Sequence, residues 1–565
     1  MFKNIFKKEQ ASKPVEEVIL EVSGMTCDHC ATSIEKLVSQ KKGVKKVEAS
    51  YPQASCVCEF DPAVTSKGEI IATINGTKNY RVKDETPAQS GSNGIPRYDL
   101  IIIGGGSAAF SAAIKAEDLG LSVLMVNGGL PFGGTCVNVG CVPSKTLIRA
   151  AETAYHASHS NFPGIVPKGA NVDFAKVIQG KKQLVASLQQ KKYMDVVCDF
   201  KHLKMVQGWA EFVDEKTILV NGKDRYTALK FLIATGATTN VPAIEGLEET
   251  GYLTNTTLFD LEEKPESLTI MGAGYIGLEI AMAYNRLGSK VRIIEFTDRV
   301  LRTQTPDISE ALETQIRSEG IEILPNFRAV KFEKQGTDTI IHCKCPDGSF
   351  TKITEPGKVV VASGTRPNTQ KLGLDKTGLK LGPKGHILVN ERMETNLPHI
   401  FAAGDVTDTP AFVYTAAFEG KIAVENAFTS ATAGQADYSS LPWVVFTDPQ
   451  VAGAGLDEAQ AAAQNIPFEV SKLELKDVPR AIAAHDTRGF IKLIRNPETD
   501  KLIGARVVAP EGGELIQQLS MAIKYGITVK ELAEGFYPYL TLGEGIKLAA
   551  ITFGKDVSKL SCCAS

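Results

Sequence analysis

Residues 17–83 combine short alternating runs of apolar and polar residues with two stretches of helical spacing. Alternation with period two predicts strands, and recurrence every three to four residues predicts a helix. One predicted helix carries Ile34 and Val38, and the other covers residues 66–74. The resulting order, β-α-β-β-α-β, is typical of a ferredoxin-like sandwich. The predicted strands are Val18–Val22, Val44–Ala49, Ser55–Phe60 and Tyr80–Val82.

The pattern changes beyond this unit. Residues 84–96, DETPAQSGSNGIP, are rich in Pro, Gly, Ser and Thr, which predicts a flexible tether. Apolar strands followed by glycine-rich turns and helices then begin twice, at Tyr98 and at Leu268, and this is typical of doubly wound α/β folds. From Pro442 onward, strands and helices are mixed without a phosphate-binding turn, so we assign this part to contact between subunits.

The size and charge of the chain narrow the possible functions. Its 565 residues are enough for three or four domains. The 62 basic and 65 acidic residues give a net charge of -3, so nothing points to nucleic acid as a partner. No apolar run reaches the roughly 18 residues that a spanning helix needs. We therefore expect a soluble protein without stable membrane insertion.

The cysteine content indicates a cellular compartment. Eleven cysteines occur in a chain whose first residues, 1–16, lack the apolar stretch and cleavage site of a signal peptide. Residues 1–16 are predicted to be a solvated tail. In a reducing cytoplasm, close cysteine pairs more often bind metals or react than form structural disulfides. We therefore expect a cytoplasmic protein with functional thiols.

A first dinucleotide fingerprint follows the strand Leu100–Ile103. Gly104, Gly106 and Ala109 form a G-x-G-x-x-A turn that opens a helix. The glycines allow the backbone to approach a pyrophosphate, and the helix N-terminus supplies a positive dipole. An acidic residue usually meets the ribose at the end of the next strand, but this chain has Asn127, which accepts a hydrogen bond without carrying charge.

A second fingerprint follows the strand at residues 268–271. It consists of three glycines, and the following strand, VRIIE, ends at Glu295. A carboxylate at this place accepts a hydrogen bond from a free ribose 2′-hydroxyl and repels a 2′-phosphate, which favours NADH over NADPH. Arg299 and Arg302 are near enough in sequence to weaken that preference. The three glycines are Gly272, Gly274 and Gly277.

Three cysteine pairs lie at the start, the middle and the end of the chain. A thiolate near a helix start has a lowered pKa, and soft metals prefer thiolate ligands. The first pair, in GMTCDHC, can hold a linear S–metal–S unit, which suits Hg(II) or Cu(I). Together the pairs predict a thiol relay that captures, transfers and reduces a thiophilic metal ion. They are Cys27/Cys30, Cys136/Cys141 and Cys562/Cys563.

The remaining cysteines have simpler interpretations. Cys56 and Cys58 fall on one face of a predicted strand, so we expect both in the core. The sequence HCKCPDG resembles a metal cluster, but a strand end before a Pro-Asp-Gly turn accounts better for Cys343 and Cys345. Cys198 is expected to be a packing residue.

The sequence GGTCVNVGCVPSK, residues 133–145, places Cys136 and Cys141 on a loop that enters a predicted helix. It resembles the redox-disulfide motif of the flavin disulfide reductases, which belong to the class I pyridine nucleotide-disulfide oxidoreductases. The resemblance covers Tyr98 to about Ala550. Further matches are ATG at residues 234–236, Tyr275 and Glu279 of the second fingerprint, and AAGDV at residues 402–406.

This resemblance implies a role for each matching residue. FAD would bind at the first fingerprint and the nicotinamide coenzyme at the second. Lys145 would lie near the flavin and pair with Glu279, while Tyr275 would gate the nicotinamide pocket. Cys141 would stack on the flavin, and Cys136 would face the substrate. The family pattern implies further FAD contacts from Gly134, Thr135, Gly236 and Asp405.

The chain departs from the disulfide reductases near its C-terminus. Where they carry the histidine of a His-Pro-x-x-x-Glu-like signature, this chain has Tyr539, with Glu544 five positions later. A phenol cannot shuttle a proton near neutral pH as an imidazole can, which disfavours a disulfide substrate. Exchange of a metal between thiolates needs much less proton transfer, and Tyr539 can hydrogen-bond a thiolate.

The combined features resemble the mercuric reductase family. They are the N-terminal soft-metal loop, the redox motif, FVYTAA around Tyr414, VPRAI followed by DTRGFIKL, Tyr539 and the terminal SCCAS. The resemblance implies FAD-dependent reduction of Hg(II) to Hg(0) by NAD(P)H, with Hg(II)–thiol complexes as the substrate and mercury detoxification as the role. NADPH is the coenzyme implied by the family, whereas Glu295 suggests NADH.

The resemblance also implies a homodimer with an active site shared across subunits, because the tail of one subunit reaches the Cys136/Cys141 site of the other. Two alternatives stay open. One is a flavin disulfide reductase of the dihydrolipoamide or glutathione type, and the other is a copper-binding or trafficking protein that uses GMTCDHC as a binding module.

The predicted fold class is α/β, with two Rossmann-like dinucleotide-binding domains, an α+β dimerisation domain, and a preceding ferredoxin-like metal-binding domain. The predicted organisation is an N-terminal tail (1–16), a heavy-metal-associated domain (17–83), a flexible linker (84–96), the first part of the FAD-binding domain (97–250), the NAD(P)H-binding domain (251–355), the second part of the FAD-binding domain (356–435), and the dimerisation domain with its Cys-Cys tail (436–565).

Overall fold

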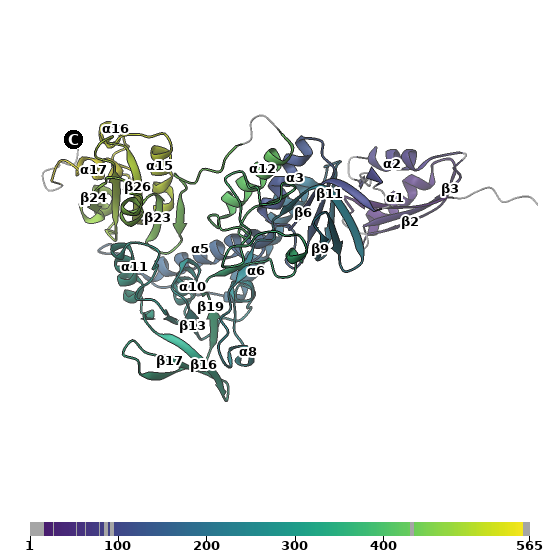
Figure 1. Ribbon diagram of the computed structural model, residues 1–565. Coiled ribbons are helices and arrows are strands. Elements are labelled where there is room, and N and C mark those ends of the chain that lie inside the picture. The colour runs from purple at the N-terminus through teal and green to yellow at the C-terminus, as the bar shows by residue number, and fades with distance from the viewer. Residues whose placement is uncertain are drawn as a thin grey trace, which may run out of the picture.

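The computed structural model describes residues 16–25, 28–51, 54–62, 64–77, 80–83, 89–90, 95–429 and 434–556. A small N-terminal unit lies at one end of the molecule, beside the first large α/β unit (Figure 1). The second α/β unit, in teal, and the C-terminal unit, in yellow-green, lie on the other side of that first unit. None of the helices in the described ranges is both apolar enough and long enough to cross a lipid bilayer.

The N-terminal unit is a four-stranded sheet of order β2-β3-β1-β4 with two helices. Its strand pairs are all antiparallel. Leu20, Ile34, Cys58 and Ile70 come from both sheet and helices and are at most 3% exposed, so the helices cover one face of the sheet. The predicted ferredoxin-like order is confirmed. The elements are β1 (Glu16–Ser23), α1 (Asp28–Ser39), β2 (Val44–Ser50), β3 (Ser55–Phe60), α2 (Lys67–Asn75) and β4 (Arg81–Lys83).

The first α/β unit is built on a sheet of order β8-β7-β6-β11-β10-β9, with β21 beside β11. Its central strands are parallel and covered by helices, which explains why every residue of β7 is buried. The strands are β6 (Pro96–Ile103), β7 (Val123–Asn127), β8 (Leu203–Gln207), β9 (Ala210–Asp214), β10 (Thr217–Val220), β11 (Asp224–Ile233) and β21 (Ile400–Ala402). The helices are α3 (Ser107–Asp118), α4 (Gly134–Asn138), α5 (Cys141–Ser158), α6 (Phe174–Gln189), the π-helical turn η1 (Gln190–Met194), α7 (Asp195–Val197) and α12 (Val413–Phe428).

Part of the predicted tether is ordered against this unit. The short strand β5 (Gln89–Ser90) pairs antiparallel with the start of β6, where Gln89 faces Arg97. The strand β6 therefore begins at Pro96, four residues before the apolar run at Leu100. The composition of residues 84–96 predicted no strand, because a two-residue pairing leaves no hydrophobic pattern.

The second α/β unit is a parallel sheet of order β15-β14-β13-β19. The sequence analysis placed residues 356–435 in the second part of the FAD-binding domain, and the sheet corrects this boundary. The strand β19 pairs with β13, and Met271 faces Val361. A run of valines fits either parallel sheet, so only the pairing assigns it. The elements are α8 (Leu247–Thr250), α9 (Asn255–Leu258), β13 (Ser267–Met271), α10 (Tyr275–Arg286), β14 (Lys290–Ile294), α11 (Pro306–Ser318), β15 (Glu322–Leu324) and β19 (Lys358–Val361).

Two further groups of strands flank this unit. A three-stranded antiparallel sheet precedes β19, and a two-stranded ribbon connects it back toward the first unit. The elements are β16 (Arg328–Gln335), β17 (Asp338–Lys344), β18 (Phe350–Glu355), β12 (Ala237–Thr239), β20 (Thr365–Pro367) and the 3-10 turn η2 (Leu374–Lys376).

The C-terminal unit has a five-stranded antiparallel sheet of order β22-β23-β26-β25-β24. Its buried core includes Leu493, Val507 and Leu519, which join the sheet to α15. The elements are β22 (Trp443–Val445), β23 (Gln450–Gly455), α13 (Glu458–Ala463), β24 (Glu469–Glu474), the 3-10 turn η3 (Leu475–Asp477), α14 (Pro479–Ala483), β25 (Phe490–Arg495), β26 (Leu502–Ala509), α15 (Gly512–Lys524), α16 (Val529–Glu534) and α17 (Glu544–Ile551).

Candidate redox and dinucleotide site

The first fingerprint forms a tight turn between β6 and α3. Gly104 has a φ of +131°, and a Cβ there would lie 2.1 Å from the carbonyl oxygen of Ala234. Only glycine fits such an approach. The helix α3 begins after Gly106 without a side-chain N-cap, which leaves its first N–H groups for another acceptor. A phosphate group fits this place, because the free N–H groups and the helix dipole both favour an anion.

Asn127 lies at the carboxyl end of β7 beside this turn. Its side chain is buried, and a Cβ on Gly105 would lie 2.5 Å from the Asn127 carboxamide carbon. The Asn127 Nδ2 group donates to the Leu130 carbonyl at 2.8 Å and to Gln207 Oε1 at 3.3 Å. The residue therefore stands where the sequence placed it, and its contact with a ribose stays a prediction.

The second fingerprint repeats this geometry between β13 and α10. Gly272 has a φ of +112°, and a Cβ there would lie 2.5 Å from the Ala362 carbonyl oxygen. A Cβ on Gly277 would lie 2.0 Å from the Gly272 carbonyl oxygen, so this glycine lets the helix pack on the turn. A Cβ on Gly274 would meet no described atom within 4 Å. The open space before an uncapped helix start again fits a phosphate.

Glu295 has a role that the sequence did not reveal. It is 5% exposed, and its Oε2 accepts a hydrogen bond from the Ala273 N–H of the fingerprint turn at 2.6 Å. Its Oε1 accepts from the Thr297 N–H at 2.7 Å and from Thr297 Oγ1 at 2.8 Å. The carboxylate therefore holds the turn in shape. Arg299 and Arg302, which were expected to modify coenzyme choice, both pair with Asp298, at 2.9 and 2.8 Å.

The loop that carries Cys136 and Cys141 packs directly on the first fingerprint. Gly134 has a φ of +64°, and a Cβ there would lie 2.6 Å from the Gly106 Cα. Cys136 then lies in the short helix α4, and Cys141 is the first residue of α5. This close approach of two backbones places both cysteines next to the predicted FAD site.

The two thiols differ in acidity. In this structure both are free thiols, and they share a side-chain hydrogen bond. That hydrogen bond, supported by the charge of Lys145, lowers the pKa of Cys141 to about 7 against the opposing effect of burial. The same hydrogen bond, together with burial, raises the pKa of Cys136. Cys141 is therefore the thiol that ionises first.

We expect this difference to appear in the pH dependence of alkylation. The thiolate is the reactive form, so the rate of Cys141 modification by iodoacetamide should rise with pH and reach half its plateau near pH 7 in the reduced protein. Mass spectrometry of the modified peptide measures this rate. The Cys136→Ala variant loses the hydrogen-bond donor to Cys141, so the midpoint for Cys141 should move toward the ordinary value near 9. A wild-type midpoint at or above 9 would contradict the assignment.

Lys145 and Glu279 meet as the family resemblance implies. Lys145 Nζ lies 2.7 Å from Glu279 Oε2, which joins α5 to α10. The other carboxylate oxygen, Oε1, accepts the Phe446 N–H at 3.0 Å, and Lys145 Nζ lies 4.6 Å from the centroid of the Phe446 ring. Phe446 was missed in the sequence, because nothing in its local pattern shows a contact with residues so far away.

Aromatic residues surround the two helix starts. Tyr275, at the start of α10, stacks on Trp443 with ring centroids 5.7 Å apart, and its hydroxyl lies 3.3 Å from Gln304 Nε2. The hydroxyl of Tyr193, a residue that the sequence analysis did not identify, lies 3.4 Å from Ser107 Oγ. Burial raises the pKa of Tyr193, and the charges of both redox cysteines add to this shift. Its place in a π-helical turn distant from every motif left no sequence signal.

The AAGDV segment is held by a buried carboxylate. Asp405 follows β21, and burial raises its pKa. Glu419 on α12 is fully buried and accepts hydrogen bonds from the Gly404 N–H and the Tyr438 hydroxyl, each at 2.7 Å. The sequence did not identify Glu419, because a glutamate in an amphipathic helix usually faces solvent. Gly236 has a φ of +67° with open space around it, and Thr135 lies in α4 beside Cys136.

Several predicted thiols lie outside this cluster. Cys27, Cys562 and Cys563 fall outside the described residues. Cys30 lies in the first turn of α1. In the described ranges no group of three or more His, Cys, Asp or Glu side chains is arranged to hold a metal ion. A two-thiolate site of the kind predicted in GMTCDHC is smaller than such a group.

The other cysteines follow the sequence analysis with one exception. Cys56 and Cys58 are fully buried, with their sulfurs 3.6 Å apart, as expected for core residues. Cys343 is buried in β17, and Cys345 begins the turn before β18. The prediction for Cys198 was wrong, because this residue is exposed at the end of α7 and its thiol donates to the Asp195 carbonyl.

Tyr539 and Tyr414 lie at the surface of the described chain. Tyr539 is 52% exposed in the segment between α16 and α17, and its neighbour Phe536 has no cover at all. Tyr414, near the start of α12, lines a cavity of about 400 Å³ together with residues of α15, including Met521. Exposed aromatic residues at this density mark a surface that contacts another molecule.

The geometry agrees with the relatives of the chain. Residues 98–420 match the family model for pyridine nucleotide-disulphide oxidoreductases, and residues 441–550 match the dimerisation domain of that family. Residues 19–81 match the heavy-metal-associated domain.

Curated relatives match nearly the whole chain. The chain is 39% identical to a mercuric reductase of Staphylococcus aureus, over 96% of this chain and 98% of the relative. It is 40% identical to a mercuric reductase of Lysinibacillus sphaericus over 96% of this chain and 99% of the relative. A mercuric reductase of Streptomyces lividans is 42% identical over 83% of this chain and 98% of its own length.

Solved structures share the fold of the main body. The HOCl-induced flavoprotein disulfide reductase RclA from Escherichia coli aligns with a TM-score of 0.71 at 28% identity, covering 80% of this chain and 98% of that one. Its Cu(II) complex aligns with a TM-score of 0.73 at 27% identity, covering 81% and 100% of the two chains.

Proposed function

The chain belongs to the mercuric reductases of the pyridine nucleotide-disulphide oxidoreductase family, and on that premise we propose that it reduces Hg(II) to Hg(0) with NAD(P)H. The reaction converts Hg(II) and NAD(P)H into Hg(0), NAD(P)⁺ and a proton, so two electrons leave the coenzyme and two reach the metal. FAD, when bound, carries these electrons between the two sites. The proposed biological role is mercury detoxification.

One observation carries the proposal most directly. The Cys136/Cys141 loop packs on the first dinucleotide turn, with Gly134 against Gly106, and Cys141 has its pKa lowered to about 7. A thiolate that is available at neutral pH beside a dinucleotide site can bind a soft metal where electrons arrive.

The residues of the site divide the work. Cys136 and Cys141 hold Hg(II) as thiolates. The ion pair with Glu279 holds the positive charge of Lys145 near these thiolates. Tyr275, stacked on Trp443, closes the nicotinamide side and excludes water. Hg(0) has little affinity for thiolates and leaves once it is formed.

Metal delivery uses the thiol pairs in order. Hg(II) passes from small thiols to Cys27/Cys30 or directly to Cys562/Cys563, and then to Cys136/Cys141. Each exchange forms one new S–Hg bond before an old one breaks, so the ion is never bare. The exposed aromatic surface around Phe536 and the dimerisation-domain match support a homodimer in which the tail of one subunit serves the site of the other. The cysteine usage supports the reducing cytoplasm as the location.

Replacing Cys562 and Cys563 with alanine should impair turnover of thiol-complexed Hg(II) roughly tenfold or more, because the metal then loses its transfer ligands. The rate at which the coenzyme bleaches flavin absorbance should change less than twofold by the same estimate. Stopped-flow spectroscopy measures both rates in one preparation. Equal losses in both rates would refute the relay.

Coenzyme choice is the second part of the proposal. The buried Glu295 carboxylate stands at the strand end where a ribose 2′-group is bound in this fold, and Asp298 pairs with both nearby arginines. A 2′-phosphate there would face unfavourable charge worth about 1–3 kcal/mol. We therefore expect NADH to exceed NADPH in kcat/KM by roughly 5- to 160-fold, the ratio equivalent to this free energy.

One assay tests the function and the coenzyme together. The flavin-loaded protein is given Hg(II) in excess thiol with NADH or NADPH, while coenzyme absorbance and volatile mercury are recorded. Hg(II)-dependent oxidation with equal release of Hg(0) is the expected result. Failure of both signals in a flavin-replete sample would reject the function, and a strong NADPH preference would reject the coenzyme assignment alone.

The two alternatives are supported less well. The disulfide reductases with solved structures are 27–28% identical to the chain, whereas the mercuric reductases reach 39–42%. Tyr539 in place of a histidine also disfavours disulfide cleavage. A copper-binding role for the N-terminal unit alone would not explain the two dinucleotide-binding turns.

A further inference from the structure

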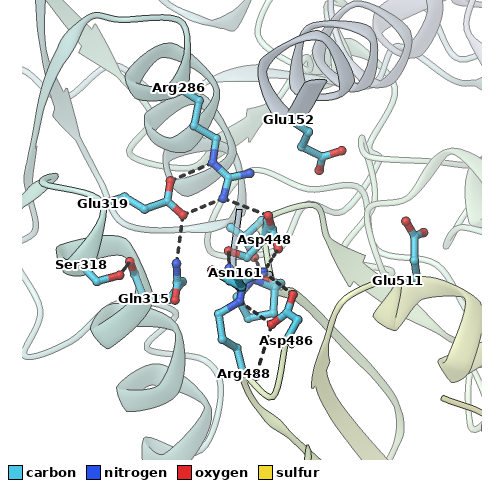
Figure 2. A network of polar contacts seen from close by, with 12 residues as sticks. Glu152, Asn161, Arg286, Gln315, Ser318, Glu319, Asp448, Asp486, Arg488 and Glu511 are labelled. Carbon is cyan, nitrogen blue, oxygen red and sulfur yellow. Dashed lines mark hydrogen bonds and ion pairs between the residues drawn. The ribbon is translucent and has the colours of Figure 1, made fainter. Parts of the chain in front are cut away.

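We propose that an ion-pair cluster centred on Asp448, remote from the cysteines, is a positioning device for the Lys145–Glu279 pair. The cluster consists of Arg286, Glu319, Asp448, Asp486 and Arg488, and is called the Asp448 cluster below. It joins the second α/β unit to the C-terminal unit (Figure 2).

The Asp448 cluster is a chain of alternating charges. Arg286 donates to both oxygens of Glu319, at 2.6 and 2.8 Å, and to Asp448 at 2.9 Å. Arg488 donates to the other Asp448 oxygen at 2.8 Å and to Asp486 at 2.6 Å. Asp448 is therefore the one carboxylate in the cluster that bridges both arginines, as Figure 2 shows.

The side chains of the Asp448 cluster are largely buried, which restricts the geometry of their contacts. The Arg286 and Glu319 side chains are each 2% exposed, and the Asp448 side chain is 13% exposed. Arg286 also lies over the Tyr155 ring of α5, 4.1 Å from its centroid. A bidentate guanidinium with so little water around it has one favourable geometry, so it fixes the position of its partner.

The Phe446–Asp448 segment touches α10 at two places. At one end the Phe446 N–H donates to Glu279, and at the other Asp448 pairs with Arg286. Glu279 and Arg286 are seven residues, about two turns, apart on α10, so they share one face of the helix, roughly 10 Å apart along its axis. A short segment held at both ends cannot shift along the helix without breaking one contact.

The consequence reaches Lys145. Glu279 accepts from both Phe446 and Lys145, and the Phe446 ring lies under the Lys145 ammonium. Lys145 is one-third exposed, so without these contacts it would turn toward solvent. The Asp448 cluster thus determines where the ammonium stands, although none of its members contacts Lys145 in the described structure.

The Asp448→Asn variant tests this inference. Arg286 keeps Glu319 and Arg488 keeps Asp486, so each arginine retains a carboxylate and the fold should persist. Hydrogen–deuterium exchange of the peptide containing residues 444–449 should become about tenfold faster, because the Phe446 amide loses protection. The matched control is Glu458→Gln, which removes a carboxylate from Lys492 in another contact network between the same two units, and there the exchange should stay unchanged.

A second readout concerns the flavin and rests on the proposed function. The Lys145 charge favours the reduced cofactor, so in Asp448→Asn the ratio of oxidised to reduced flavin against a reference dye should rise three- to tenfold, or about 14–30 mV for a two-electron couple. Unchanged exchange in the 444–449 peptide, or an unchanged flavin ratio, would overturn the inference. If Asp448→Asn does not fold, Arg286→Lys gives the same two readouts. Neither readout uses Hg(II), so a failure of this inference can be distinguished from a failure of the proposed mercury reduction.

Discussion

Replacing Cys141 with serine should lower Hg(II)-dependent coenzyme oxidation by roughly 1,000-fold or more, the scale on which loss of an essential nucleophile acts. The serine hydroxyl stays protonated at neutral pH and its oxygen is a poor ligand for a soft metal. The hydrogen bond that makes Cys141 the acidic thiol of the pair would have no thiolate to stabilise. Coenzyme absorbance in the presence of Hg(II) and excess thiol measures the effect.

The matched control for this variant is Cys198→Ser. Cys198 is also a cysteine at a helix end, but it is exposed and its thiol donates to the nearby Asp195 carbonyl. The Hg(II)-dependent activity of the Cys198→Ser variant should stay within about twofold of that of the unmodified protein, as for other surface substitutions. If Cys141→Ser kept more than a tenth of the activity, or if both variants lost activity equally, the Cys136/Cys141 pair would not be the place of reduction.

Replacing Glu279 with alanine should destabilise the main body by about 2–4 kcal/mol. Removal of one partner from a buried ion pair costs about 3–5 kcal/mol, and the partial exposure of Lys145 reduces this value. The variant also leaves the Phe446 N–H without its acceptor. Glu279→Gln keeps an acceptor for that N–H, so its loss should be smaller.

Urea unfolding followed by tryptophan fluorescence measures this effect. The chain has two tryptophans, and Trp443 lies in β22, three residues before Phe446. The midpoint should fall by about 1 M in urea for Glu279→Ala. The control is Glu313→Ala, which removes an i,i+4 pair with Arg317 on α11 and should cost less than about 0.5 kcal/mol. Equal midpoints for the two variants would show that the Lys145–Glu279 pair carries no special stability.

The two dinucleotide turns show which structural features can be predicted from local sequence. Gly104 and Gly272 both have positive φ values and both face a backbone carbonyl at a distance that only glycine tolerates. These conformational requirements depend on only a few neighbouring residues, so the spacing of the motif was enough to predict the turn and the helix that follows it. The phosphate contact stays a prediction. The Cys136/Cys141 motif predicted a loop that enters a helix, and α5 does begin at Cys141, but Cys136 lies in the short helix α4 rather than in a loop.

Sheet membership could not be predicted in the same way. The strand β19 was assigned to the wrong domain because its valines fit any buried parallel strand. The pairing of β5 with β6 is too short to leave a pattern. Glu295 was assigned correctly to a strand end, but the contacts of its carboxylate depend on how the following segment folds back.

The sequence by itself determined the local chemistry of this protein: two glycine turns for dinucleotides, a thiol pair at a helix start, and a ferredoxin-like unit. The tertiary structure decided how these parts act together. Lys145 and Glu279 are 134 positions apart, and Glu279 and Phe446 are 167 positions apart. Such contacts follow from the packing of whole units against one another, which leaves no periodic signal in the chain. Local conformational demands are therefore readable from the sequence, whereas the electrostatic surroundings of the thiols arise only when the units are packed together.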